Sequence, residues 1–405
     1  MPEAVIVATA RSPIGRARKG SLKDVRPDDL AAQMIRAALE QVPQLDPSTI
    51  DDLQLGCAIP EGYQGGNLAR TVAIRLGLDA VPGATVTRFC ASSIQTTRAA
   101  FHAIRAGEAH AMISAGVESI SHSTGKLMEE DARDPQFQQA WERTDARASR
   151  EIPAPWHDPR EDDQLPDPYI LMGQTAENVA ELRGISRQAQ DEYAVRSQNR
   201  AEAAKASGFF DRDITPVTLP DGTVVSADDS PRAGVTYEAV SGLDPVFRPD
   251  GTVTAGNCCP LNDGAAALVI MSDVRAKELG LTPLARIVST GVSGLSPEIM
   301  GLGPVESTRR ALASAGMGIG DIDLVELNEA FAAQVIPSAE DLGIDHDKLN
   351  VHGGAIALGH PWGSTGARMT TTLLHGLQER DGQFGLATLC VGGGQGMALI
   401  IERMN

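Results

Sequence analysis

One α/β unit recurs along the chain, and this internal repeat is the strongest constraint on the fold. The segment VIVATARSPIG at 5–15 opens the chain as a buried strand, and ARIVSTGVSG at 285–294 opens the second half in the same way. Further along, TIDDLQLGCA at 49–58 can be aligned with GDIDLVELNEA at 320–330. The sequence therefore predicts an internal duplication of one α/β unit.

The repeat also brings reactive side chains into correspondence. When the two halves are superposed in this way, Cys57 falls on Asn328. The same shift carries Cys90 to position 361, beside His360. Cys90 and His360 are therefore expected at nearly equivalent points of the two halves.

Hydrophobic periodicity predicts alternating strands and helices within each half. Apolar runs of five to nine residues indicate buried strands, and apolar residues at helical spacing indicate amphipathic helices. The first half is expected to have strands at 5–10, 51–58, 85–89 and 111–117 and helices at 28–42 and 92–106. The second half is expected to have a helix at 305–317, a turn followed by a helix within 353–377, and a strand at 385–394.

A stretch of different composition, roughly 121–250, separates the two halves. Its first part is rich in charge and proline and poor in periodicity, whereas 188–206 reads as a helix and 217–226 as a strand–turn pair. Long excursions of this kind are usually functional or disordered, and the helix favours a lid packed over the core. The expected division is residues 1–120 plus about 251–275 for the N-terminal half, 121–250 for the lid, and 276–405 for the C-terminal half.

The charge balance disfavours polyanionic surfaces as the main partner. Acidic residues outnumber basic ones by 53 to 35, which gives a net charge of −18. Nucleic acids and anionic membranes attract the opposite charge. The longest apolar run, AAALVIM at 265–271, is too short to span a bilayer. We therefore expect neither nucleic-acid binding nor membrane insertion.

Five cysteines, an odd number without any CxxC spacing, argue against a disulfide framework and against a structural zinc site. Free thiols in a reducing compartment are the default for such a set. The N-terminal sequence MPEAVIVATARSP lacks the basic region and long apolar core of a signal peptide. We expect a cytoplasmic protein with no bound metal.

Two of the residues fit the pairing of a thiol with an imidazole that activates cysteine for acyl transfer. Cys90 stands where a strand ends and a helix begins, and a helix N-terminus is expected to lower its pKa toward neutrality. The alternative is a small buried cysteine that happens to start a helix. His360 lies in the glycine-rich run GGAIALGHPWGSTG, which suits an imidazole presented from a rigid turn, although a lone histidine is often structural.

Near the C-terminus, Cys390 precedes the run VGGGQG. Glycines there allow close approach of a substrate and leave backbone N–H groups free to point into a site. The run fails as a dinucleotide-binding fingerprint because too few residues follow it. Asn328 ends a strand of the second half, where its amide could orient a water or hold an oxyanion.

Together these segments resemble the thiolase family (acetyl-CoA acyltransferases) along essentially the whole chain. The resemblance implies an α/β, thiolase-like fold with a duplicated five-layered αβαβα core and an inserted lid domain. The matching segments are RSPIG (11–15), FCASSIQ (89–95), SAGVES (114–119), MGQTAENVA (172–180), DGTVTAGN (250–257), LNDGAAAL (261–268), ELNEAFA (326–332), NVHGGAIALGHP (350–361) and LCVGGGQG (389–396).

The resemblance assigns a role to each of five positions. Cys90 matches the nucleophile that becomes an acyl-thioester, and His360 matches the base that takes its proton. Cys390 matches the second cysteine, which exchanges a proton with Cα of the other substrate. Asn328, through a water and with His360, matches one oxyanion site, and the N–H groups of Cys90 and Gly392 match the other.

The resemblance also implies a set of positions that contact the substrate or CoA, whose members are Met172, Ala255, Cys259, Ala330, Phe331 and His352. Cys259 stands in AGNCCP where the family often has serine, so the pantetheine contact made there is weaker or lost. Cys258 and Cys259 are otherwise expected to be packed, unreactive thiols. Arginines 183, 187, 232 and 248 are candidates for the CoA phosphates, although such arginines are more often ordinary surface residues.

The implied activity is CoA-dependent thiolysis of 3-ketoacyl-CoA, or the reverse condensation of acetyl-CoA, within fatty acid metabolism and β-oxidation. CoA and acyl-CoA are then substrates, with no permanently bound cofactor, and a homodimer or homotetramer is expected. Two alternatives are a ketoacyl synthase of the same superfamily and an inactive acyl-CoA-binding protein. Cys390 favours the thiolase, because the synthases lack the second cysteine, and the retention of Cys90 and His360 argues against an inactive binder.

Overall fold

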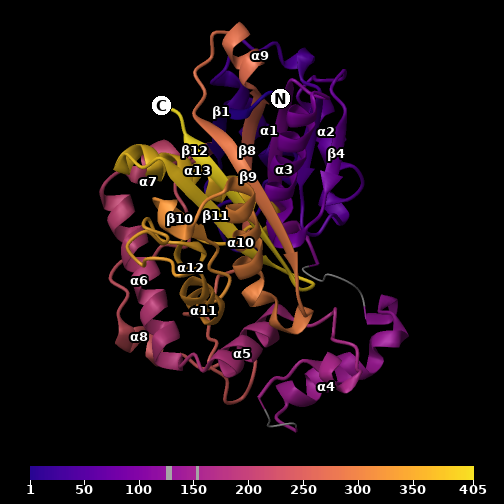
Figure 1. Ribbon diagram of the computed structural model, residues 1–405, viewed down its shortest axis with the longest axis vertical. Helices are drawn as coiled ribbons and strands as arrows, with labels where there is room; N and C mark the ends of the chain where they lie inside the picture. Colours follow the sequence, from indigo (N-terminus) through magenta and orange to yellow (C-terminus); the bar gives the residue numbers. More distant parts are fainter. Residues whose placement is uncertain (125–129, 152–154) are drawn as a thin grey trace.

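A computed structural model describes residues 1–124, 130–151 and 155–405 of the chain. Both termini lie at one end of the molecule, and helices α4 and α5 lie at the opposite end (Figure 1). The lid expected at 121–250 contains both undescribed stretches. The described part is built around one mixed sheet of ten strands.

The N-terminal half contributes the strand order β1-β8-β5-β3-β4, with the short β2 paired to β8. β3 pairs in parallel with both β4 and β5, whereas β8 is antiparallel to β5 and to β1. The elements of this half are β1 (Ala4–Arg11), β2 (Gly15–Arg16), α1 (Pro27–Glu40), β3 (Asp52–Gly56), α2 (Leu68–Arg75), β4 (Gly83–Val86), α3 (Ser92–Ala106), β5 (Ala111–Ser119), β8 (Asn262–Ser272) and α9 (Asp273–Glu278).

The C-terminal half repeats this topology in the order β9-β12-β11-β10. β10 pairs in parallel with β11, and β12 is antiparallel to β11 and to β9. A single parallel bridge between Val325 and Leu349 stands where the first half has β4. The elements are β9 (Ala285–Gly294), α10 (Gly303–Ala315), β10 (Leu324–Leu327), α11 (Ala332–Leu342), α12 (Ala355–Leu358), α13 (Thr365–Arg380), β11 (Phe384–Val391) and β12 (Gln395–Arg403).

The two halves of the sheet are joined where each begins. Only Val5 and Ile6 of β1 pair with Arg286 and Ala285 of β9. β1 and β9 are the first strands of the two repeated units, so the two copies of the unit meet along equivalent strands. The repeated order of strands and helices agrees with the duplication predicted from the sequence.

Helices α3 and α13 lie between the two halves of the sheet and form the central layer. Apolar residues of both helices share one core with strands from both halves. Their close approach needs small residues: a Cβ added at Gly366 of α13 would lie 2.5 Å from Ile94 of α3. Helices α1 and α2 cover the outer face of the first half, and α10 and α11 cover that of the second. The result is the layer order αβαβα.

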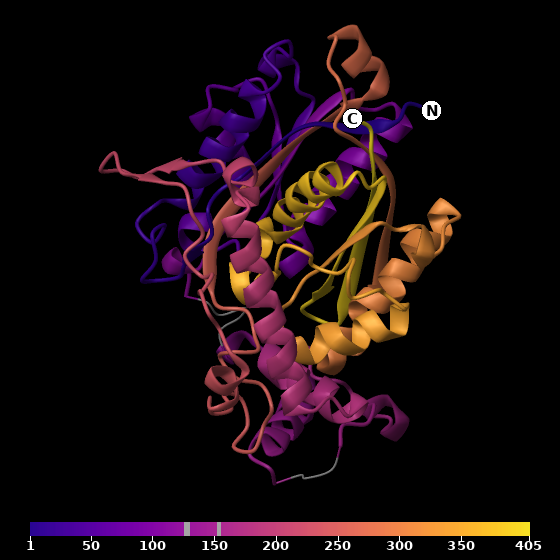
Figure 2. The same ribbon diagram turned by 90° about the vertical axis from the view of Figure 1, so that its left-hand side faces the viewer.

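The segment between β5 and β8 wraps around the lower end of the core and along one side of it (Figure 2). Its elements are α4 (Gln138–Ala148), α5 (Met172–Arg183), α6 (Arg187–Ala206), α7 (Phe209–Asp213), β6 (Val217–Thr218), β7 (Val224–Val225) and α8 (Tyr237–Ser241). Helix α6 and the β6–β7 pair confirm two predicted elements. Helix α4 lies in the charged, proline-rich run for which the sequence predicted no particular element.

No helix among the described residues is long and apolar enough to cross a membrane.

Candidate active site

The turn that holds Cys90 connects β4 to α3 as a short 3₁₀ segment, Phe89–Ala91. Phe89 has φ +44°, a left-handed conformation that is unusual for a bulky side chain and marks local strain. Ser92 holds the turn, because its hydroxyl donates to the Phe89 carbonyl (2.7 Å) and accepts from the Arg88 N–H (2.9 Å). The turn therefore fixes the Cys90 thiol at the start of α3.

The thiol of Cys90 has the opposite pKa shift from the one predicted. Burial raises its pKa to about 12, and this outweighs the N–H groups of Gly392 and of Cys90 itself, which lower it. The prediction of a near-neutral pKa was wrong for the free protein, because a helix N-terminus does not compensate for removal of a thiolate from water. Cys90 is therefore a thiol at neutral pH and needs a base to become a nucleophile.

His360 follows a backbone turn at Gly359, where φ is +113° and a Cβ would lie 2.6 Å from Ile14. Its N–H donates to Asn262 Oδ1 (3.0 Å), and its ring lies between Thr365 Oγ1, 2.7 Å from Nδ1, and Asn328 Nδ2, 3.3 Å from Nε2. An amide nitrogen facing Nε2 requires that Nε2 accept, so the ring proton lies on Nδ1. The lone pair on Nε2, which accepts from Asn328 in the resting protein, is the one a general base needs.

Burial keeps this imidazole neutral. The pKa of His360 is lowered to about 3, first by burial and then by the charge of Arg368. The turn after His360, Trp362–Ser364, packs against the Cys90 turn. Just beyond it, the Ala367 N–H donates to the Ser93 hydroxyl (2.9 Å), which ties the start of α13 to the start of α3. The structure thus brings together the Cys90 turn and the neutral histidine's turn from opposite halves.

Cys390 lies at the end of β11, fully buried opposite Gly396 of β12. Burial raises the pKa of its thiol well above the usual value, and the neighbouring Cys90 raises it further. Its sulfur lies 3.7 Å from the carboxamide of Gln334 on α11. In the orientation that gives both its nitrogen and its oxygen a hydrogen-bond partner, the carboxamide nitrogen donates to the Asn328 backbone carbonyl (3.2 Å). Gln334, which the sequence did not single out, therefore links Cys390 to Asn328.

Asn328 follows β10, and its N–H donates to the Thr388 carbonyl of β11 (3.0 Å). Its side chain is buried, and Oδ1 has no hydrogen-bond partner among the described residues. A buried amide oxygen without a partner is costly unless a water or ligand occupies the site. The group is therefore placed to hold a polar atom beside His360.

Gly392 begins the turn between β11 and β12. Gly393 and Gly394 follow with φ of +75° and +77°, conformations that glycine adopts without strain. A Cβ at Gly392 would lie 3.5 Å from the Phe89 ring and 3.6 Å from the Met172 sulfur. The turn therefore lies directly against the Cys90 turn and the start of α5.

Of the predicted substrate positions, four gather around Cys390. Met172, Ala330, Phe331 and Cys259 belong to one apolar cluster with it. The Cys259 N–H donates to the Ala330 carbonyl (3.0 Å), which ties the AGNCCP run to the NEAFA run. Ala255 lies in a tight, exposed turn of the same run.

His352 does not join this group. Its ring stacks on Phe209 at 3.6 Å, and its Nε2 contacts Glu379 Oε2 at 2.6 Å. Glu379 is at the far end of α13 from Thr365, the partner of His360, and the two are separated by about 20 Å of helix. His352 therefore packs against the C-terminal end of α13, and the structure does not bring it together with the other predicted substrate positions.

Three of the arginines considered for CoA phosphates are bound within the protein. Arg183 forms two hydrogen bonds to the Asp341 carboxylate (2.6 and 2.7 Å), and Arg187 binds Asp191 (2.6 Å). Arg248 is buried and binds Gln174 Oε1 at 2.9 Å. Arg183 joins the lid to α11 of the core, whereas Arg187 and Arg248 bind partners within the lid itself, so none of the three is free for a phosphate.

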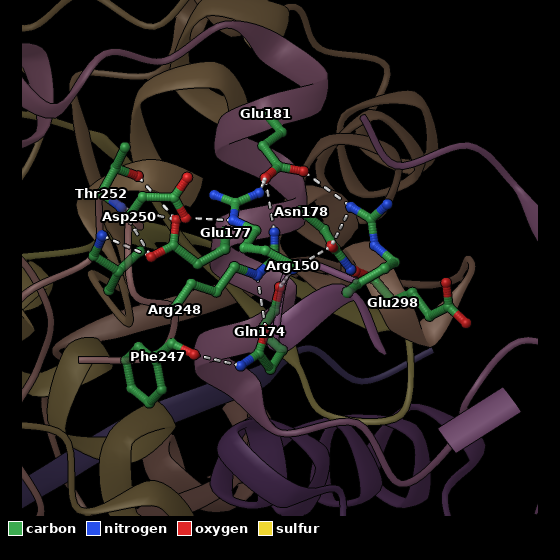
Figure 3. Close-up of polar contacts among 12 residues, drawn as sticks. Arg150, Gln174, Glu177, Asn178, Glu181, Phe247, Arg248, Asp250, Thr252 and Glu298 are labelled. Carbon is green, nitrogen blue, oxygen red and sulfur yellow. Dashed lines mark hydrogen bonds and ion pairs between the residues drawn. The ribbon is translucent and has the colours of Figure 1, made fainter. Parts of the chain in front are cut away.

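The arrangement around Arg248 is shown in Figure 3. Its guanidinium also binds Asn178 Oδ1 (2.7 Å) and Glu181 Oε1 (2.9 Å), so it spans three side chains of α5. Gln174 in turn donates to the Phe247 carbonyl (2.7 Å), and a Cβ at Gly173 would overlap the Phe247 ring. The network therefore fixes Phe247 beside the start of α5, in the same apolar cluster as Cys390.

No group of metal-ligating side chains is found among the residues that the structure describes. A surface cavity of about 390 Å³ is lined by seven residues of the N-terminal half, which are Arg26, Asp28, Gly62, Tyr63, Gly65, Leu68 and Thr71. None of the predicted site residues lines this cavity, so it carries no argument about the chemistry at Cys90.

The comparisons with known proteins agree with this geometry. The family model for the thiolase N-terminal domain matches residues 4–274, and that for the thiolase C-terminal domain matches residues 281–403. The chain belongs to the thiolase family. It is 42% identical to a 3-ketoacyl-CoA thiolase of Bacillus subtilis over 99% of this chain and 100% of that protein.

Two solved structures of the thiolase family resemble the chain closely. Bacillus anthracis acetyl-CoA acetyltransferase has a TM-score of 0.86 at 40% identity, covering 100% of this chain and 99% of that one. Human mitochondrial 3-ketoacyl-CoA thiolase in complex with CoA has a TM-score of 0.85 at 35% identity, covering 100% and 98%. The predicted family and fold class are confirmed, and neither alternative function gains support.

Proposed function

We propose that the chain catalyses CoA-dependent thiolysis of 3-ketoacyl-CoA and the reverse condensation of acetyl-CoA, through an acyl group carried on Cys90. The proposal rests on the surroundings of the Cys90 thiol. The thiol lies against the N–H groups of Cys90 and Gly392, and the turn that follows the neutral His360 packs against the turn that holds Cys90. This combination provides a nucleophile, a base and two donors for a developing oxyanion.

In the first half-reaction, Nε2 of His360 takes the Cys90 proton, and the thiolate attacks the 3-keto carbon. The alkoxide collapses, the C2–C3 bond breaks, and the shortened acyl group stays on Cys90. The leaving enolate of acetyl-CoA takes a proton at C2 from the Cys390 thiol. Two proton-transfer groups are required because one thiol and one carbon acid change protonation state, and each contributes about 10²–10⁴ in rate.

In the second half-reaction, CoA enters and its thiol gives a proton to the Cys390 thiolate. The CoA sulfur attacks the acyl-thioester, and the departing Cys90 thiolate recovers its proton from His360. The products are acetyl-CoA and an acyl-CoA shorter by two carbons, with all protons returned. Met172, Phe247 and Phe331 form an apolar wall beside Cys390, which suits the pantetheine arm and acyl chain.

The test is the loss of the ultraviolet absorbance of acetoacetyl-CoA when CoA is added to the protein. Wild-type protein is expected to consume acetoacetyl-CoA in proportion to CoA and to form two acetyl-CoA. Binding of acetoacetyl-CoA without its consumption would contradict the proposal.

We also propose that the chain forms a homodimer or homotetramer. β4 ends the sheet, and all four of its residues are half-buried although no described strand pairs with its outer edge. Such an edge is usually protected, and pairing with β4 of a second copy would protect it. Light scattering is expected to give at least a dimer, and a monomer at micromolar concentration would contradict this.

For the domain organisation, we propose residues 1–120 with about 251–275 as the N-terminal half, 121–250 as the lid and 276–405 as the C-terminal half. β8 supports the first of these boundaries, since it returns after the lid to pair with both β1 and β5. Limited proteolysis is expected to cut first within 121–250. A first cut inside 276–405 would count against the boundaries.

We further propose a cytoplasmic role in fatty acid β-oxidation. All five cysteines are free, which suits a reducing compartment. Cell fractionation is expected to place the protein in the cytoplasm, and a kcat/KM series across 3-ketoacyl-CoA chain lengths is expected to show cleavage of chains longer than acetoacetyl-CoA. Activity confined to acetoacetyl-CoA would exclude the β-oxidation role.

A further inference from the structure

Arg88, two residues before the Cys90 nucleophile position, is a half-buried cation whose partners are neutral. Its Nε donates to Gln95 Oε1 on α3 (3.0 Å), and its Nη1 donates to Gln395 Oε1 (2.7 Å). Among the residues that the structure describes, no carboxylate forms an ion pair with it, and Arg98 is a further cation nearby. A cation removed from water without an opposite charge is costly, so its retention calls for a reason.

The side chain of Gln395 continues the contact toward Gly392. Its Oε1 accepts from Arg88, and its Nε2 donates to the Gly392 carbonyl (3.3 Å). Gln395 also starts β12 and pairs with Val391 across the turn. One side chain therefore connects the guanidinium of Arg88 to the backbone of the residue whose N–H approaches the Cys90 thiol.

Arg88 is equally fixed at its backbone. Its N–H donates to the Ser92 hydroxyl, which also binds the Phe89 carbonyl, so Arg88 belongs to the Cys90 turn. Its side chain reaches the other turn, which comes from the opposite half of the chain. Arg88 is thus a bridge between the two peptide segments that carry the N–H groups of Cys90 and Gly392.

Such a bridge is needed because Gly392 is followed by two more glycines. Glycine has the largest backbone freedom of any residue, and an oxyanion site requires donors fixed at 2.7–3.1 Å from the developing charge. Holding the Gly392 carbonyl restricts rotation about the Gly392 backbone and therefore the direction of its N–H. The Phe89 ring, packed against Gly392, limits movement from the other side.

We propose that Arg88 and Gln395 are positioning residues that hold the Gly392 N–H at a fixed separation from the Cys90 N–H. This rests on the proposed function and on the oxyanion role of these two N–H groups. The bridge acts on the tetrahedral alkoxide formed at Cys90 and does not contact the substrate, so it affects kcat and leaves substrate affinity unchanged.

The decisive variant is Gln395→Glu. The new carboxylate still accepts from Arg88, as an ion pair, but it cannot donate to the Gly392 carbonyl and repels it. If the bridge served only to stabilise the fold, this change would preserve or strengthen it. We expect kcat for acetoacetyl-CoA thiolysis to fall about tenfold, less than the 10²–10³ of a deleted donor, with KM within about twofold and the melting temperature unchanged or higher.

Arg88→Ala is expected to lower kcat by a similar factor, and Arg88→Lys to recover little, since an ammonium cannot span both glutamines as a planar fork does. Arg98→Ala, which removes a neighbouring cation outside the bridge, is the matched control and should keep wild-type kcat. A wild-type kcat in Gln395→Glu, or an equal loss in Arg98→Ala, would overturn the proposal. An inactive wild-type protein would instead overturn the proposed function, so the two failures are distinct.

Discussion

The two halves of the sheet use equivalent strand ends in different ways. Gly56 of β3 faces Gly116 of β5, and Leu327 of β10 faces Thr388 of β11, so these pairs are in the same register. One residue beyond the first strand of each pair lie Cys57 and Asn328. Two residues beyond Gly116 and Thr388 lie Glu118 and Cys390.

In the N-terminal half these positions form a closed network. Glu118 accepts from the N–H groups of Ala58 (2.8 Å), Ile59 (3.3 Å) and Gly363 (2.9 Å), from Gln64 Nε2 (3.0 Å) and from the Cys57 thiol (3.7 Å). Burial raises the pKa of Glu118, and these hydrogen bonds oppose the shift.

In the C-terminal half the equivalent positions are satisfied only in part. Asn328 Oδ1 is buried without a partner among the described residues, and Cys390 meets the carboxamide of Gln334 beside the apolar cluster. Gly363, held by Glu118, belongs to the turn after His360. The duplicated framework thus provides two equivalent sites, of which one fixes the loops around Cys90 and the other leaves Asn328 Oδ1 without a partner in the described part of the chain, beside Cys390, the group proposed to meet the substrate.

The largest effect is expected at Cys90, which both sites surround. Cys90→Ala should abolish thiolysis and condensation, with a loss of at least about 10⁴ in kcat, because it removes the thiol proposed to carry the acyl group. Both directions are measured with acetoacetyl-CoA and acetyl-CoA. Residual turnover within about tenfold of wild type would show that the acyl group is carried elsewhere.

Cys390→Ala should lower the rate of carbon–carbon bond exchange by about 10²–10⁴, since it removes one proton-transfer group. Acylation of Cys90 should survive. Cys258→Ala, a thiol in the same cluster to which no proton transfer is assigned, is the matched control for packing. Near-normal turnover of Cys390→Ala would refute its assigned role.

Asn328→Ala and Cys57→Ala compare one position in the two halves. Asn328→Ala should cost about 10²–10³ in kcat, as expected for loss of the group proposed to hold the water that donates to an oxyanion. Cys57→Ala should leave kcat within about twofold and lower the free energy of unfolding by about 1 kcal/mol, for one buried hydrogen bond. Equal effects on kcat would end the distinction between the halves.

Glu118→Gln should mainly affect stability. An amide nitrogen would face N–H donors now satisfied by the carboxylate, and we expect a loss of about 1–3 kcal/mol in the free energy of unfolding. Urea denaturation measures the loss, and kcat per folded molecule should change less than in Asn328→Ala. If kcat collapses while stability is kept, Glu118 takes part in the chemistry.

A further effect, on stability alone, is a pH dependence from His360. Because its folded pKa, about 3, lies below the unfolded value of about 6.5, the unfolded chain binds more protons between these values. Stability from this group is therefore full above about pH 6.5 and declines as pH falls toward 3. The urea midpoint of His360→Asn should fall less than that of wild type between pH 7.5 and 5. An equal decrease of the urea midpoint in the two proteins would contradict a buried neutral imidazole at His360.

The sequence predicted much of the fold because local pattern and repeat agree. The helix at 92–106 and the strand beginning at Ala111 were found where expected. Five site residues could be proposed from the sequence because they lie in recognisable motifs, namely Cys90, His360, Cys390, Asn328 and Gly392; their roles stay predictions.

The remaining features depend on contacts between distant segments, which no local pattern contains. The raised pKa of Cys90 follows from burial, and the stacking of His352 on Phe209 joins residues far apart in the chain. The roles of Glu118 and Gln395 likewise arise from loops that meet only in the folded protein. Helix α4 was missed because a charged, proline-flanked run gives little helical periodicity.

Cys90 is proposed to carry the acyl group while Cys390, from the other half, completes the exchange. Cys390→Ala incubated with acetyl-CoA and digested at low pH should show one acetyl group by mass spectrometry, on the peptide that contains Cys90. An acetyl group on another cysteine, or none while the Cys390→Ala protein stays folded, would contradict this account.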